Sequence, residues 1–116
     1  MGYFYYGTQS YEIELPDRAL AHLKVALLSL LRSGQSVAFT FARPVAVGSG
    51  RETLWITPTT NVRFRFQGDQ PPRLNEQWVR AIMATAGEPT GLVIVPEPSA
   101  EPAEQVGTAS GASSVL

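Results

Sequence analysis

The side chains best suited to chemistry are few in this chain of 116 residues. It has no cysteine, one histidine (His22) and one lysine (Lys24). Covalent nucleotidyl transfer needs a lysine nucleophile beside acidic metal ligands, and Lys24 lacks a Lys-x-Asp-Gly context. A serine hydrolase would have to use His22, but no serine stands in the strand-turn-helix setting of such a nucleophile. We therefore predict no catalytic residue and expect His22 to face solvent.

Two further patterns resemble site motifs but favour ordinary structure. Glu12 and Glu14 alternate along one expected strand, a spacing more typical of a solvated face than of an acid-base pair. Residues 47–51, Val-Gly-Ser-Gly-Arg, could cradle a phosphate, but they lead into a strand and lack a Gly-Lys-Ser/Thr ending. A hairpin turn is the better interpretation. We predict no metal ligand and no cofactor-binding residue.

Arginine and tryptophan form the most suggestive set. Arg63 and Arg65 alternate on one expected strand, and Trp55 lies on the strand before it. Exposed arginines beside an indole on an open sheet can hold phosphates and stack on bases. The turn length between the two strands decides whether Trp55 shares the face of the arginines. The predicted binding face comprises Arg43, Trp55, Thr57, Arg63 and Arg65.

The elements that must position these residues begin with a hairpin of residues 3–6 and 11–15. Strict alternation in the second strand directs Tyr11, Ile13 and Leu15 to the core. Pro16-Asp17 then opens a helix that ends before Gly34. Its leucines cover one side, and a thin polar stripe on the other comprises Arg18, His22, Ser29 and Arg32.

Three strands follow, over residues 37–43, 52–57 and 62–67, and alternation predicts an antiparallel meander with one apolar and one small or cationic face. A second helix runs from its cap Asn75 to Gly87, and residues 92–95 form a last strand. The fold class is α+β: a single domain of order ββαβββαβ, with a mostly antiparallel sheet and two helices packed on one face.

Charge and composition divide the chain at residue 96. Residues 1–96 hold all nine lysines and arginines and seven of the ten acidic residues, whereas residues 97–116 hold three glutamates and no positive charge. The Pro/Gly/Ser/Ala-rich composition of 97–116 predicts a disordered acidic tail after a compact domain. The absence of cysteine, of a signal peptide and of a membrane-spanning segment favours the cytoplasm.

Several segments together resemble a known family, over residues 1 to about 97. They are Asp17-Arg18-Ala19-Leu20-Ala21-His22-Leu23, Val47-Gly48-Ser49-Gly50-Arg51, Leu54-Trp55-Ile56-Thr57-Pro58, Arg63-Phe64-Arg65-Phe66, Pro71-Pro72, and Gly91-Leu92 after the Trp78 helix. The chain resembles a short actinobacterial domain of unknown function whose members often carry the automatic label "ATP-dependent DNA ligase". The resemblance implies a link to DNA metabolism and no functional residues.

Three hypotheses of function follow, and the last of them in order is an enzyme of unrecognised type. The favoured hypothesis is a non-catalytic interaction module that forms a homo-oligomer or docks on a protein partner, since an open sheet leaves edge strands that can pair. The alternative is a nucleic-acid-binding accessory domain that uses the arginine and tryptophan face. The small net charge of −1 speaks against a dedicated nucleic-acid binder.

Overall fold

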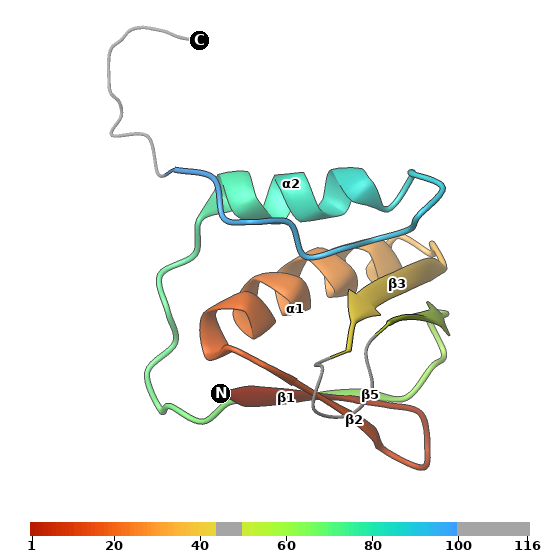
Figure 1. The fold of residues 1–116 in the computed structure, drawn as a ribbon, viewed down its shortest axis with the longest axis horizontal. Coiled ribbons are helices and arrows are strands. Elements are labelled where there is room, and N and C mark those ends of the chain that lie inside the picture. Colours follow the sequence, from red (N-terminus) through yellow and green to blue (C-terminus); the bar gives the residue numbers. More distant parts are fainter. Residues whose placement is uncertain (44–49, 100–116) are drawn as a thin grey trace, which may run out of the picture.

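The computed structural model describes residues 1–43 and 50–99 (Figure 1). The elements are β1 (Gly2–Tyr6), β2 (Tyr11–Leu15), α1 (Asp17–Arg32), β3 (Val37–Ala42), β4 (Arg51–Ile56), β5 (Val62–Arg65) and α2 (Glu76–Thr85). A parallel bridge between Phe39 and Leu92 follows α2. The predicted α+β class and the order ββαβββαβ are confirmed, and the last strand is reduced to this bridge. Residues 47–49 of the predicted turn and 100–116 of the predicted tail lie outside the described residues.

The strands form two sheets, in the orders β2-β1-β5 and β3-β4, and neighbouring strands are antiparallel. This corrects the expected meander, because β5 pairs with β1 instead of β4. The turn after β4 is held by its own threonines, with the Thr57 amide donating to Thr60 Oγ1 at 2.8 Å. The amide of Gly7 in the β1-β2 turn donates to the Asn61 carbonyl at 2.8 Å, which brings the start of β5 beside β1.

Both helices lie on the same side of the three-stranded sheet, with α2 stacked on α1 (Figure 1). The leucine-rich side of α1 packs on β1 and β3, as its spacing predicts. α2 turns Trp78 and Ile82 into the core. The largest fully buried side chains are Phe4, Leu20, His22, Leu23, Leu27, Phe39, Ile56, Ile82 and Leu92.

The chain after α2 returns along β3. The Leu92 amide donates to the Ala38 carbonyl at 2.7 Å, and the Thr40 amide donates to the Leu92 carbonyl at 2.9 Å. Gly91 precedes this contact at φ +82°, and a Cβ there would collide with the Ala38 carbonyl oxygen. Only glycine both adopts this positive φ without strain and leaves room for the Ala38 carbonyl oxygen. Neither described helix has the length and apolar character needed to cross a lipid bilayer.

Candidate interaction surface

The five residues of the predicted binding face are divided between the two sheets. Arg63 and Arg65 are exposed on β5 of the three-stranded sheet. Trp55 lies opposite Ala38 in the two-stranded sheet and is 61% exposed. The sequence therefore identified two arginines that share one face, together with an exposed tryptophan that belongs to a different sheet.

The other two predicted residues make contacts within the domain. Thr57 hydrogen-bonds through Oγ1 to the hydroxyls of Thr59 and Thr60 in the turn after β4. Arg43 forms an ion pair with Glu52 and donates to the Tyr11 hydroxyl at 3.2 Å. The ion pair with Arg43, followed by the hydrogen bond from Tyr11, lowers the pKa of Glu52 below its ordinary value. Both residues therefore contribute to the internal structure.

The strand register places Arg63 and Arg65 in an ordered charge pattern. Tyr5 of β1 lies between Glu12 of β2 and Arg63 of β5, and Tyr3 lies between Glu14 and Arg65. Residues directly opposite one another in antiparallel strands point to the same face of the sheet. We call this face, formed by Tyr3, Tyr5, Glu12, Glu14, Arg63 and Arg65, the outer face. It carries an acidic row, a tyrosine row and a basic row.

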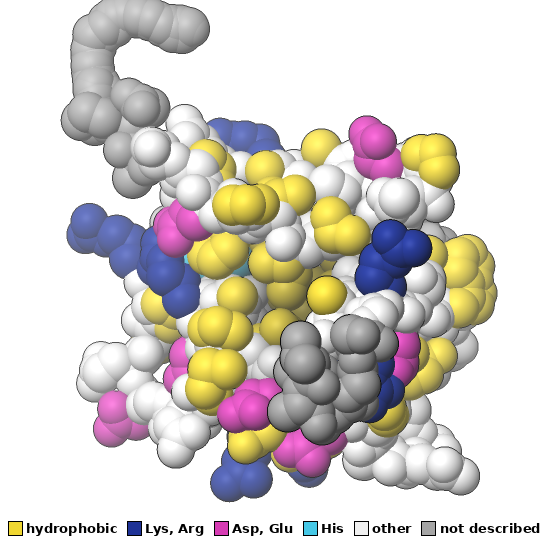
Figure 2. Space-filling model, viewed as in Figure 1, with side chains coloured by type: hydrophobic (Ala, Val, Ile, Leu, Met, Phe, Trp, Pro, Cys, Tyr) yellow, Lys and Arg dark blue, Asp and Glu magenta, His cyan; other side chains and the backbone are white. Residues whose placement is uncertain are grey.

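Alternation along each strand makes this arrangement a direct consequence of the sequence. Phe4, Ile13 and Phe64 face the helices and pack in the core, so their neighbours must point outward. The two glutamates and two arginines are exposed and the tyrosines are half-buried. In Figure 2, acidic and basic side chains both protrude along the lower edge, where Figure 1 places these strands.

The charges of the outer face form no ion pair among the residues that the structure describes. None of Glu12, Glu14, Arg63 and Arg65 takes part in the ion pairs found among residues 1–43 and 50–99. The Arg63 guanidinium instead lies 4.2 Å from the centroid of the Tyr5 ring. Since β1 separates β2 from β5, the two strands that carry the acidic and basic rows run about 10 Å apart.

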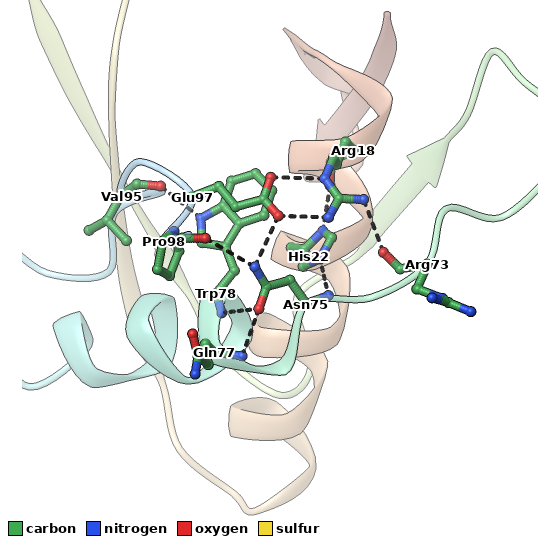
Figure 3. A network of polar contacts seen from close by, with 9 residues as sticks. All are labelled: Arg18, His22, Arg73, Asn75, Gln77, Trp78, Val95, Glu97 and Pro98. Carbon is green, nitrogen blue, oxygen red and sulfur yellow. Dashed lines mark hydrogen bonds and ion pairs between the residues drawn. The ribbon is translucent and has the colours of Figure 1, made fainter. Parts of the chain in front are cut away.

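A second cluster of polar residues, which the sequence did not reveal, lies between α1, α2 and the C-terminal segment (Figure 3). Arg18 donates from Nε and Nη2 to the two carboxylate oxygens of Glu97, at 2.9 and 2.6 Å, and from Nη1 to the Arg73 carbonyl at 3.0 Å. Asn75 Nδ2 donates to Glu97 Oε2 at 3.0 Å and to the Pro98 carbonyl at 3.2 Å. We call these residues, with His22 and Trp78, the polar network.

The prediction that His22 faces solvent is wrong, because the structure buries this side chain fully. Its Nδ1 lies 2.7 Å from the Arg18 carbonyl oxygen, and its Nε2 accepts from the Asn75 amide at 2.8 Å. This pattern assigns the neutral tautomer with the proton on Nδ1. The imidazole also lies against Trp78, with ring centroids 4.5 Å apart. Packing of α2 on α1 covers the predicted polar stripe at His22, whereas Arg18 and Arg32 of the same stripe are exposed.

The network includes Glu97 and Pro98, which follow the predicted domain boundary at residue 96. The Trp78 indole donates to the Val95 carbonyl at 2.7 Å, and Glu97 and Pro98 accept the bonds described above. The bonds from Arg18, and next those from Asn75, lower the pKa of Glu97 from 4.5 to about 2. The polar groups of the network bond chiefly to one another, so it acts as a clamp between α1, α2 and residues 95–98.

One residue of the polar network, Asn75, has a role that the sequence predicts. Its side-chain oxygen accepts from the Gln77 and Trp78 amides, so it caps α2 as predicted. The same residue offers its amide to His22 and its Nδ2 to Glu97. Within the described residues, no group of three or more histidine, cysteine, aspartate or glutamate side chains is arranged to hold a metal ion.

Comparison with known families places residues 1–97 in a family described as "Domain of unknown function (DUF7882)". Comparisons with curated proteins and with solved structures found no match. The chain belongs to this domain family of unknown function, and the match covers both the outer face and the polar network up to Glu97.

Proposed function

We propose that this member of the family is a non-catalytic interaction module of the cytoplasm that docks on a protein through the outer face. The observation that carries the proposal is the arrangement of Glu12, Glu14, Arg63 and Arg65 in two rows without ion pairs to other described residues. Charges so arranged can form ion pairs with a partner that presents a complementary pattern.

The tyrosine row supports a protein partner. Tyr3 and Tyr5 are half-buried, and their ring centroids lie 6.2 Å apart. Tyrosine is enriched at protein interfaces because it offers a large apolar ring and a hydrogen-bonding hydroxyl at little cost in conformational entropy. The tyrosines would form the centre of an interface, and the two charged rows would form its rim.

Nucleic-acid binding is the second candidate, favoured by Arg63 and Arg65 and by the ligase label of similar domains. The acidic row on the same face weighs against it, because Glu12 and Glu14 would repel phosphates bound at the arginines. Trp55 belongs to the other sheet, so it does not complete a stacking platform on the outer face.

Fluorescence anisotropy with labelled single- and double-stranded DNA at low salt separates the two candidates. We expect negligible binding by the wild-type protein. Submicromolar binding that is lost in the Arg63→Ala/Arg65→Ala variant would favour the nucleic-acid candidate instead.

Site-specific photo-crosslinking tests the protein-docking proposal itself. The photoreactive amino acid p-benzoyl-phenylalanine replaces Tyr5 on the outer face or, as a control, Arg80 on the exposed side of α2. Irradiation of cells that make each variant should yield a protein adduct from position 5 and none from position 80. Absence of any protein adduct from position 5 would overturn the proposal.

A further inference from the structure

We propose that the protein seated on the outer face is a second copy of this chain, related to the first by a twofold axis that runs parallel to β1. This inference rests on the proposed function, and it names the partner and the geometry of docking. It follows from the order of the three rows, which is acidic on β2, tyrosine on β1 and basic on β5.

The order of the rows makes the outer face complementary to itself. When two copies meet face to face, rotation about an axis parallel to β1 exchanges the two sides of the sheet. The acidic row of each copy then lies over the basic row of the other. Glu12 and Arg63 both stand level with Tyr5, so Glu12 of one copy comes opposite Arg63 of the second. By the same argument, Glu14 comes opposite Arg65.

The alternative face-to-face arrangement is electrostatically unfavourable. An axis in the plane of the interface but perpendicular to β1 would set each row over the same row of the second copy. Glutamates would then oppose glutamates and arginines would oppose arginines, which costs free energy in a partly dehydrated interface. Packed sheets keep their strands within about 30° of one another, so the favourable arrangement keeps the opposed rows in register.

The tyrosine row occupies the centre of the arrangement. Tyr3 and Tyr5 of the two copies meet near the axis, where aromatic rings can pack edge to face or offset. The contact between the Arg63 guanidinium and the Tyr5 ring, at 4.2 Å, holds that arginine over the sheet. Carboxylates of the second copy would find this guanidinium already positioned for a bidentate bond.

The size of the outer face indicates how tightly two copies should associate. Three strands of four or five residues cover a patch about 15 Å across, smaller than the roughly 800 Å² per partner of a standard stable interface. We therefore expect a weak, reversible dimer, with a dissociation constant roughly in the micromolar range or above. Because the rim is charged, salt should weaken the association.

Charge reversal gives a set of variants that tests this geometry. Arg63→Glu/Arg65→Glu makes the whole outer face acidic, and Glu12→Arg/Glu14→Arg makes it basic. A third variant combines all four substitutions and so exchanges the two rows. The matched control, Glu76→Arg/Arg80→Glu, reverses an exposed i,i+4 pair on α2. The substituted outer-face positions are exposed, and circular dichroism and thermal melting verify that each variant folds.

Sedimentation equilibrium at concentrations up to the millimolar range measures the association. The wild type and the control should dimerise equally. The all-acidic and all-basic variants should each associate at least about tenfold more weakly alone, and an equimolar mixture of them should recover the dimer. The variant with all four substitutions should dimerise with itself about as tightly as the wild type, because exchange of the two rows preserves their complementarity about an axis parallel to β1.

The outcomes distinguish this inference from the function on which it rests. A wild type that stays monomeric throughout, or a dimer that none of the outer-face substitutions affects, would overturn the second-copy proposal. If the Tyr5 position still crosslinked to a different protein in cells, the docking function would stand without the homodimer. If that position gave no protein adduct, both would fail.

Discussion

The polar network and the outer face both contain arginine and glutamate but use them in opposite ways. In the network, Arg18 and Glu97 form a two-point ion pair, and Asn75 donates to the same carboxylate. On the outer face, Arg63 and Glu12 are held on opposite sides of Tyr5 and do not form an ion pair with each other. Under our proposal, charge serves internal stability in one region and recognition in the other.

The cause of this difference lies in chain geometry. The network residues come from α1, the start of α2 and the C-terminal segment, which converge at one place (Figure 3). The outer-face charges come from β2 and β5, which β1 separates, and no ion pair joins them among the described residues. Substitutions in the two regions should therefore have different consequences.

The two tryptophans should give the largest contrast. Trp78→Ala removes a side chain that is 6% exposed, contacts His22 and bonds to the Val95 carbonyl, so it should reduce the free energy of unfolding by about 3–5 kcal/mol. The control Trp55→Ala, at a residue 61% exposed, should cost much less. Urea denaturation measures both. Equal losses would mean that the network is no more structural than the exposed surface.

Replacement of His22 tests the buried hydrogen bonds separately from ring packing. His22→Phe keeps a ring beside Trp78 but cannot accept from the Asn75 amide, which leaves a buried donor unpaired. We expect a loss of about 1–3 kcal/mol. Hydrogen exchange should also show faster exchange of the Asn75 amide. An unchanged stability would show that the imidazole bonds contribute nothing to the clamp.

Acid titration should identify the contribution of Glu97. Its pKa in the folded protein is about 2, below the ordinary value of 4.5. A lowered pKa means that the carboxylate stabilises the fold fully above about pH 4.5 and loses this effect as pH falls toward 2. The stability difference between the wild type and Glu97→Gln should therefore shrink over that interval. A difference that is constant from pH 6 to about pH 2 would contradict the linkage.

The smallest effect on stability is expected on the outer face. Arg63→Ala/Arg65→Ala removes one contact with Tyr5 and no ion pair within the described residues, so the free energy of unfolding should change by less than about 1 kcal/mol. The same variant should lose self-association in sedimentation. A destabilisation as large as that of Trp78→Ala would show that these arginines support the fold instead of recognition.

Local patterns predicted the elements and the direction of many side chains. Alternation placed Ile13 and Phe64 inside, with Glu12, Glu14, Arg63 and Arg65 outside, and the structure confirms this. The prediction that Tyr11 also faces the core is wrong, because Tyr11 is exposed and its hydroxyl donates to Glu52. The capping role of Asn75 is also confirmed. These features depend on neighbours within a few residues, which is the range that periodicity and capping describe.

Features that depend on distant contacts were not predictable in this way. The pairing of β5 with β1 joins segments about sixty residues apart and decides that Arg63 shares a face with Glu12. His22 is buried because α2 covers α1, and Glu97 contacts both helices because Arg18 and Asn75 donate to its carboxylate. Each result depends on tertiary packing that overrides a local pattern.

A concentration series of amide chemical shifts tests the central claim most directly, because it shows which face of the folded domain associates. As the concentration of the wild-type protein rises, shifts should move for the outer-face residues Tyr3, Tyr5, Glu12 and Arg63, and the movement should diminish in high salt. Amides near Gln77 on α2 should stay unchanged. Shifts confined to α2 or the polar network, or none up to millimolar concentration, would contradict self-association through the outer face.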